Sequence, residues 1–225
     1  MKVLITSILL LLLICEVQGQ QIKNTKTLDD NFQKFDTAAY YKRIEHYDPF
    51  GADPNHLRFK DGTEIFRSAH TDSFEEEVHL PKPSFLKILR TFYPSGFIKM
   101  KGYSFGDLNE GANGVKVGNW YYFNEQGKLT ETVNEDQKFG NVDYPKILAI
   151  LEKDGLINIK TGKNREQVTA FFERNDDGTS VWKLEVITEF HADDHAKVWR
   201  YSVDGSTGKI LERLRLTITY TEIDH

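Results

Sequence analysis

The sequence predicts an α+β fold made mostly of antiparallel β-hairpins, with a helix packed on an antiparallel sheet near the C-terminal end. Three observations support this prediction. Aromatic-rich segments alternate with polar turns that contain glycine, which is the pattern of hairpins. Two segments carry apolar residues at helical spacing. Aromatic residues make up 12% and apolar residues 39% of the 225 positions, so the bulk of the chain is expected to fold around a core.

Residues 1–19 have the pattern of a secretory signal peptide. A short positive region precedes the apolar run Val3–Ile14, which is too short to span a bilayer because a spanning helix needs about 20 residues. Val17 and Gly19 occupy the −3 and −1 positions of a cleavage site before Gln20. We therefore expect a secreted or periplasmic protein after cleavage near Gly19.

The only cysteine, Cys15, falls within this signal. Removal of the signal leaves no thiol and no disulfide, so core packing alone must stabilise the chain. An exported chain of this kind indicates a Gram-negative periplasm. The alternative is a lipid anchor on Cys15, because Leu12–Cys15 resembles a bacterial lipobox. Ile14 is larger than the residue usual at that position, so soluble export is the favoured prediction.

Residues 20–84 are expected to form an N-terminal helix and a hairpin. The helix is predicted over 31–45, where Phe32, Phe35 and Ala39 share one stripe. Strands are predicted over 56–80 around the turn Asp61-Gly62, because glycine accepts the positive φ of such turns. The run Glu75–Glu77 is expected to be a solvated strand end, with a cation site as the alternative.

Two related hairpins are predicted in residues 85–134. Phe92–Lys99 has the pattern strand, turn, strand, and Asn119–Leu129 repeats it. In each, an aromatic-rich strand runs into a polar turn whose glycine, Gly96 or Gly127, precedes a new strand. The two glycines are 31 residues apart, which indicates a repeat.

These hairpins resemble the bacterial MORN-variant repeat. The similarity lies in Tyr93–Lys99 and, more specifically, in Gly114–Leu129, which resembles a pattern of spaced glycines around Trp-x-Tyr-Tyr, with Phe123 in the place of the second Tyr. The array is minimal and is interrupted by a loop over 106–114. The resemblance implies stacked β-hairpins and an association with toxin-neutralising or surface-associated proteins.

Residues 143–225 are expected to form a helix followed by a sheet. Asp143 is the predicted N-cap and Gly155 the residue that ends the helix. The following strands are predicted at Val168–Phe172, Val181–Phe190, Trp199–Asp204 and Ile210–Tyr220. For Val168–Phe172 a helix is the alternative, and a strand is favoured because a turn and an alternating segment follow it.

This C-terminal part resembles a PepSY-type module. The similarity lies in Trp182–Val186 and in Trp199–Leu211, which contains a Val-Asp-x-x-Thr-Gly-Lys-Ile-Leu hairpin. It covers residues 143–220 and implies a helix packed on an antiparallel sheet. The family is linked to restraint of peptidases and to extracytoplasmic regulation, and no residue-level site transfers from it.

Charge is distributed unevenly along the chain. The net charge of −5 argues against a general nucleic-acid binder. Residues 82–129 nevertheless hold seven basic and three acidic side chains. One interpretation is complementarity to an acidic partner or to lipid headgroups, and the favoured alternative is a set of outward-facing lysines that solubilise an aromatic core. The candidate binding residues of this segment are Lys99, Lys101 and Lys116.

Four consecutive aromatic residues, Trp120–Phe123, lie in the second hairpin. Alternation along a strand places Trp120 and Tyr122 on one face and Tyr121 and Phe123 on the other. We expect Trp120 in the core. Tyr121 and Phe123 are candidates for an aromatic binding face, with burial of both pairs as the favoured alternative.

The densest polar cluster offers weak metal-ligand candidates: His191, Asp193, Asp194 and His195. Imidazole and carboxylate groups can ligate zinc, but a solvated turn is the favoured interpretation because short structural zinc motifs usually contain cysteine. No cofactor is predicted. The sequence contains no nucleophile-elbow motif, phosphate loop or dinucleotide fingerprint, so we expect a protein that is not an enzyme.

These observations together predict a non-enzymatic binding protein whose partner is a protein of the cell envelope. Toxin neutralisation is the leading role, restraint of a peptidase is the alternative, and a metal-dependent hydrolase is a distant third. Contact with a membrane surface is not favoured. The sequence predicts no oligomeric state.

Overall fold

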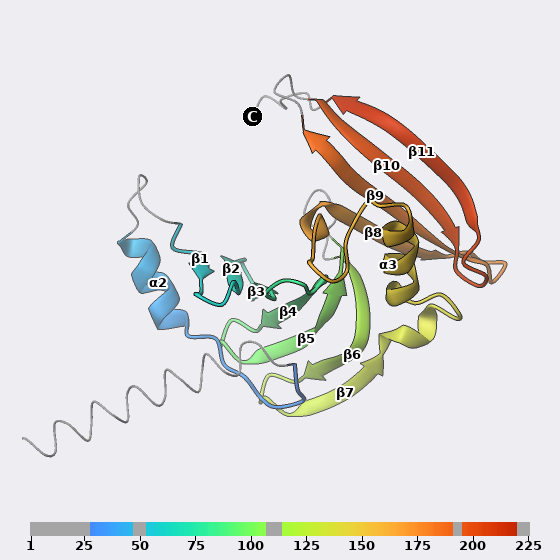
Figure 1. The fold of residues 1–225 in the computed structure, drawn as a ribbon. Helices are drawn as coiled ribbons and strands as arrows, with labels where there is room; N and C mark the ends of the chain where they lie inside the picture. The colour runs from blue at the N-terminus through green and yellow to red at the C-terminus, as the bar shows by residue number, and fades with distance from the viewer. Residues whose placement is uncertain (1–27, 47–52, 107–113, 191–194, 220–225) are drawn as a thin grey trace, which may run out of the picture.

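A computed structural model describes residues 28–46, 53–106, 114–190 and 195–219 (Figure 1). The expected signal peptide with Cys15 lies outside these residues. The described chain forms two antiparallel β-sheets and two short α-helices, so the coarse α+β prediction is confirmed. No helix in these ranges is long and apolar enough to cross a membrane.

The larger sheet has seven strands in the order β1-β2-β3-β4-β5-β6-β7, so strands that are consecutive in the chain are neighbours in the sheet. Its strands are β1 (His56–Arg58), β2 (Glu64–Ala69), β3 (Phe74–His79), β4 (Leu86–Phe92), β5 (Ile98–Phe105), β6 (Val115–Phe123) and β7 (Leu129–Asn134). The pairing of β3 with β4 crosses the boundary expected between segment 20–84 and the hairpins of 85–134. The two segments therefore share one sheet.

The turns of the two predicted hairpins have the expected backbone. Gly96 has a φ of 81° between β4 and β5, and Gly127 has a φ of 76° between β6 and β7. A Cβ at Gly127 would also lie 2.4 Å from the ring of Phe32. Both turns need glycine because a side chain is strained at positive φ.

The N-terminal helix is shorter than the sequence predicts. The helix α2 spans Thr37–Glu45 and begins after its N-cap, Asp36. The preceding residues are extended, and the amide of Phe35 donates to the carbonyl of Gly96 at 2.7 Å. The Phe35 ring stacks on Phe74 with ring centres 4.8 Å apart. Packing of this ring on the sheet outweighs the helical pattern of the segment.

The smaller sheet has four strands in the order β11-β10-β9-β8. Its strands are β8 (Val168–Arg174), β9 (Ser180–Phe190), β10 (His195–Asp204) and β11 (Ile210–Thr219). The helix α3 (Tyr144–Lys153) begins after Asp143, whose carboxylate accepts a hydrogen bond from the amide of Lys146, and Gly155 follows its end at a φ of 72°. Two short 3-10 helices, η1 (Glu135–Lys138) and η2 (Arg165–Gln167), complete the described elements.

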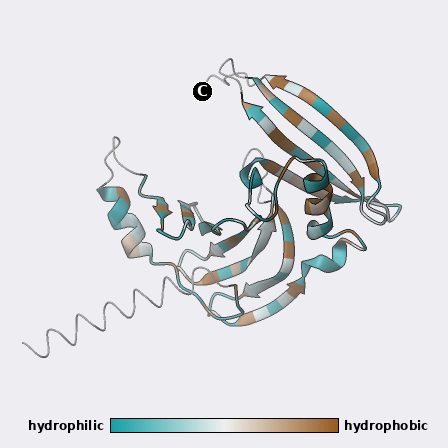
Figure 2. Ribbon diagram, viewed as in Figure 1, coloured by the Kyte–Doolittle hydropathy of each residue, from teal (hydrophilic) through white to brown (hydrophobic). Residues whose placement is uncertain are grey.

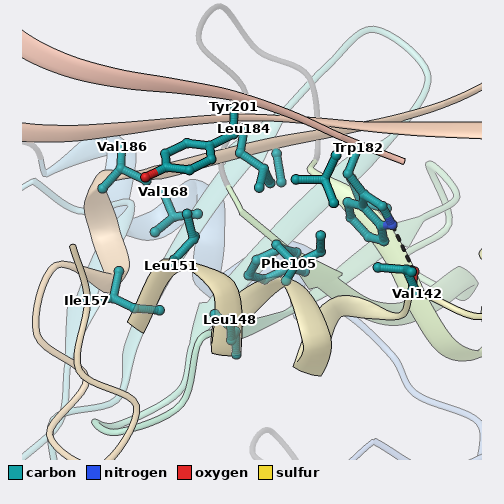
Figure 3. Close-up of a cluster of buried hydrophobic side chains, with 14 of the residues drawn as sticks. Phe105, Val142, Leu148, Leu151, Ile157, Val168, Trp182, Leu184, Val186 and Tyr201 are labelled. Carbon is teal, nitrogen blue, oxygen red and sulfur yellow. Dashed lines mark hydrogen bonds between the residues drawn. The ribbon is translucent and has the colours of Figure 1, made fainter. Parts of the chain in front are cut away.

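The largest hydrophobic cluster joins α3 to both sheets (Figure 3). Trp182 of β9 is fully buried, and its indole nitrogen donates to the carbonyl of Val142 at 2.8 Å. Phe105 of β5 lies 6.3 Å from Trp182 between ring centres, and Leu151 of α3 packs in the same cluster. The two sheets therefore meet through one shared core.

Two further clusters fill one face of the seven-stranded sheet, which we call the covered face. The first contains Phe35, Tyr40, Phe74, Phe92, Ile98 and Phe123, and the second contains Ile65, Val78 and Ile88. The side chains that alternate with these along the strands point to the opposite face, which we call the second face.

Candidate functional site

The five residues predicted to form a binding surface do not lie together. Lys99 is exposed at the start of β5, and Lys116 is half-buried on the second face. Lys101, Tyr121 and Phe123 point to the covered face. No common surface unites them.

The prediction that Lys101 belongs to a binding surface is wrong, because its side chain is fully buried. Its ammonium group donates to the carboxylate of Asp29 at 3.0 Å and to the carbonyl of Asn31 at 2.7 Å. Burial lowers the pKa of Lys101, and the hydrogen bond to Asp29 opposes that effect. The N-terminal segment supplies both partners, so this lysine stabilises the fold and is not available to a partner.

The prediction that Phe123 belongs to an exposed binding face is also wrong. Phe123 is buried in the aromatic cluster of the covered face, and Tyr121 packs partly buried against the same cluster. The physical reason is that Phe35 and α2 cover this end of the sheet. These two residues therefore do not form an exposed aromatic binding face. For Phe123, the alternative prediction of burial is the correct one.

Trp120 is buried as expected, but on the second face. It is 1% exposed and belongs to none of the three clusters of the described chain. Its ring lies on Gly102, where a Cβ would be 2.1 Å away, and its indole nitrogen donates to the carbonyl of Tyr103. The ammonium group of Lys116 lies 4.1 Å from the ring centre. Only glycine leaves room for this packing.

The basic excess of residues 82–129 is largely neutralised inside the protein. Three of its basic side chains form ion pairs with acids of the N-terminal segment: Lys87 with Glu77, Arg90 with Glu76, and Lys101 with Asp29. A count of charges within residues 82–129 treats these three basic side chains as surface charge, because their acidic partners lie outside that segment. The hairpin region therefore offers less positive surface than its composition indicates.

The acidic run Glu75–Glu77 in β3 is not a fully solvated strand end. Glu76 is buried, and its carboxylate contacts Arg67 at 2.7 Å and Arg90 at 3.5 Å. Glu77 is half-buried on the second face and accepts a hydrogen bond from Lys87 at 2.6 Å. Alternation along the strand separates the neighbouring carboxylates, and each has its own partners.

Glu77 is expected to make stability depend on pH. Burial opposes its ionisation, but the hydrogen bond from His79 and the charge of Lys87 outweigh that cost and lower the pKa of Glu77 to about 2. A folded-state pKa below the ordinary value of 4.5 means that the ionised group stabilises the fold above pH 4.5 and loses this contribution as the pH falls toward 2. Urea unfolding between pH 6 and pH 3 should therefore show a shallower decline for Glu77→Gln than for the wild type. Equal slopes would contradict this assignment.

The predicted metal cluster is largely outside the described chain. His191, Asp193 and Asp194 fall there, and His195 is the first residue of β10. The rest of the described chain contains no group of three His, Cys, Asp or Glu side chains placed to hold a metal ion. The zinc alternative remains a prediction from the sequence.

The outer face of the C-terminal sheet, turned away from α3, carries an apolar patch. The register across β9, β10 and β11 places its members on this one face. We call them the outer patch: Ile187, Phe190, Ala196, Val198, Leu214, Leu216 and Ile218. Phe190 is 66% exposed and Leu214 is 40% exposed, whereas Ile187, Leu216 and Ile218 are half-buried and Ala196 and Val198 are buried. Apolar and polar bands alternate along these strands in Figure 2. Scattered apolar side chains are ordinary on a surface, whereas a contiguous set indicates an interaction site.

The inner face of the same sheet carries two arginines beside a tryptophan. The guanidinium carbons of Arg213 and Arg215 lie 4.7 and 5.8 Å from the ring centre of Trp199. The two arginine side chains are 42% and 53% exposed, and their nearest acidic contacts, with Asp154 and Glu189, measure 3.4 and 3.6 Å. We call Arg213 and Arg215 the arginine row. Cation–π contacts with Trp199 help to fix the positions of both charges.

The strand β11 carries three residues of the outer patch, Leu214, Leu216 and Ile218. It is at the edge of the sheet, and among the described residues no strand pairs with its free side. Most of its ten residues are exposed. The sequence predicts this strand and shows its alternation of leucine and arginine, but it does not predict the strand order. The candidate site therefore consists of the outer patch, the arginine row and the free edge of β11.

Comparison of the chain with protein-family models, with curated proteins and with solved structures gives no match. The resemblances to the MORN-variant repeat and to the PepSY-type module remain predictions from the sequence.

Proposed function

We propose that this chain is an exported, non-enzymatic protein that binds another protein of the cell envelope through its C-terminal sheet. The observation that carries the proposal is the outer patch, whose apolar residues adjoin one another across three strands and whose exposed members are Phe190 and Leu214. Burial of such a patch against a partner contributes roughly 25 cal/mol per Å² of apolar surface removed from water.

A protein partner suits this site better than a nucleic acid or a membrane. The net charge of −5 disfavours the phosphate backbone of nucleic acids. A bilayer cannot satisfy the backbone N–H and C=O groups on the free edge of β11, whereas another polypeptide can. The edge and the outer patch together therefore favour a protein ligand.

Toxin neutralisation is the role we propose for this binding, on the strength of the MORN-like resemblance of Gly114–Leu129. Restraint of a peptidase is the alternative, because the C-terminal sheet that carries the site is also the part that resembles a PepSY-type module. The identity of the captured protein separates the two roles.

Substitution of the outer patch tests the proposal. The exported chain should capture a protein by crosslinking in envelope extract of its host, and the purified pair should bind saturably in calorimetric titration. Leu214→Glu places a charge in the patch and should weaken this binding at least about tenfold, because a charge buried at an interface without a partner is costly. Ile44→Glu on α2 is the matched control, since Ile44 is 39% exposed and Leu214 is 40% exposed. Equal binding by the two variants, both folded, would refute the proposed site.

A further inference from the structure

The free edge of β11 has the properties of a strand-addition site. The strand has ten residues, which is longer than the usual five or six, and it contains no proline. Edge strands normally avoid unwanted pairing by being short, by containing proline or by carrying charges. In β11 the arginine row supplies the charge. The edge should therefore pair with strands that carry acidic side chains and disfavour strands that carry basic ones.

The arginine row determines the charge of a strand that would pair with this edge. Arg213 and Arg215 point to the inner face, because they pair with Tyr201 and Trp199 of β10. Side chains of an added strand would lie directly beside them on that face, at the distance of cross-strand neighbours. Acidic side chains at those positions would form ion pairs, and basic side chains would be repelled.

The outer patch determines the other side chains of that strand. Leu214, Leu216 and Ile218 point to the outer face, where Leu216 and Ile218 lie beside the buried side chains of Val198 and Ala196. An added strand would place its alternate side chains beside these three residues. Apolar side chains there would extend the patch and bury its exposed margin.

A second copy of this chain does not meet the charge requirement in the registers that bring the two arginine rows together. When two copies of β11 pair symmetrically and antiparallel about Leu214, Arg213 of one copy faces Arg215 of the other. Pairing about Arg213 or Arg215 places that arginine opposite its own counterpart. Like charges directly opposite each other are destabilising in a sheet.

We infer that the partner adds an extended segment with alternating apolar and acidic side chains to the free edge of β11, as a fifth strand of the C-terminal sheet. The inference rests on the proposed function and specifies the partner's segment. Backbone hydrogen bonds to β11 supply affinity in this mode of recognition, and the alternate side chains supply specificity.

Synthetic peptides test the inference on the full exported chain. A labelled ten-residue peptide of alternating Val and Glu should bind at least about tenfold more tightly than its Val and Lys counterpart, as measured by fluorescence anisotropy. Methylation of the backbone nitrogens at every second residue, on the edge that faces β11, should abolish binding because it removes the hydrogen-bond donors. Hydrogen exchange should show new protection in Ile210–Thr219.

Charge reversal supplies the specificity control. The double variant Arg213→Glu and Arg215→Glu should reverse the preference and bind the Val and Lys peptide more tightly. Lys99→Glu makes the same type of change on the other sheet and should alter neither affinity. Higher salt should weaken binding of the Glu peptide to the wild type, which tests the charge pairing without any substitution.

Three results would overturn the inference: equal affinity for both peptides, undiminished binding of the methylated peptide, or protection on a strand other than β11. The proposed function is tested separately by Leu214→Glu with the captured protein. If Leu214→Glu lost capture of the protein but the wild-type chain bound neither peptide, the outer patch would remain the docking surface. The free edge of β11 would then play no part in binding.

Discussion

Trp182→Ala is expected to lower the free energy of unfolding by about 3–5 kcal/mol, which is the usual cost of truncating a large buried aromatic residue. Trp182 is fully buried and lies in the cluster that joins the two sheets. The substitution leaves a cavity between rings of Phe105, Phe139 and Phe172 and removes the donor to the Val142 carbonyl. Urea unfolding followed by circular dichroism measures the loss.

Two controls separate cavity formation from other effects of this substitution. Trp182→Phe keeps most of the apolar contact but loses the hydrogen bond, so it should cost about 1–2 kcal/mol. Phe190→Ala truncates a side chain that is 66% exposed and should cost about 0.5 kcal/mol or less. A loss for Trp182→Ala no larger than that for Phe190→Ala would contradict a shared core between the sheets.

Glu76→Gln is expected to cost about 3–5 kcal/mol, although the replacement keeps nearly the same shape. The carboxylate of Glu76 lies between Arg67 and Arg90, and the side chain of Arg90 is 1% exposed. Neutralising it leaves two guanidinium groups close together with little solvent to screen them. Urea unfolding at pH 7 measures the change.

The neighbouring residue on the same strand provides the matched control. Glu75→Gln makes the same chemical change at a half-buried position on the second face, next to His70 at 3.4 Å. Its effect should stay within about 0.5 kcal/mol, because partly solvated pairs contribute little. If Glu76→Gln were equally mild, the ion pairs around Glu76 would not stabilise the covered face.

Helix ends and hairpin turns could be predicted from the sequence, because each depends on residues that are close together in the chain. The boundaries of α3 follow from Asp143 as N-cap and from Gly155 just past its end. The hairpin turns follow from glycines such as Gly96 and Gly127, which adopt positive φ. Each of these features is determined by residues within a few positions of one another.

Features that depend on distant contacts were missed for a physical reason. The pattern of Phe32, Phe35 and Ala39 predicts a helix, but Phe35 gains more by packing on Phe74 of β3. The partner of Lys101 is Asp29, which is 72 positions away. Charge counts along the chain place both groups at the surface, because the sequence does not show which segments the fold brings together.

The same limit explains why the candidate site differs from the predicted one. Composition predicts a binding surface on the basic, aromatic hairpins, but the fold buries or pairs several of the side chains behind this prediction, including Lys101 and Phe123. The strand Ile210–Thr219 attracted no prediction of binding because its alternation is ordinary for a sheet. Its position at an edge, beside the outer patch, gives it functional interest.

The central claim, that the C-terminal sheet is the binding surface, is tested most directly by amide hydrogen exchange of the whole chain with and without its captured envelope partner. The partner is expected to slow exchange in Ile210–Thr219 and in the adjoining part of β10, and to leave exchange in the seven-stranded sheet unchanged. Protection centred on β6, around Lys116 and Tyr122, with unchanged exchange in β11, would contradict it.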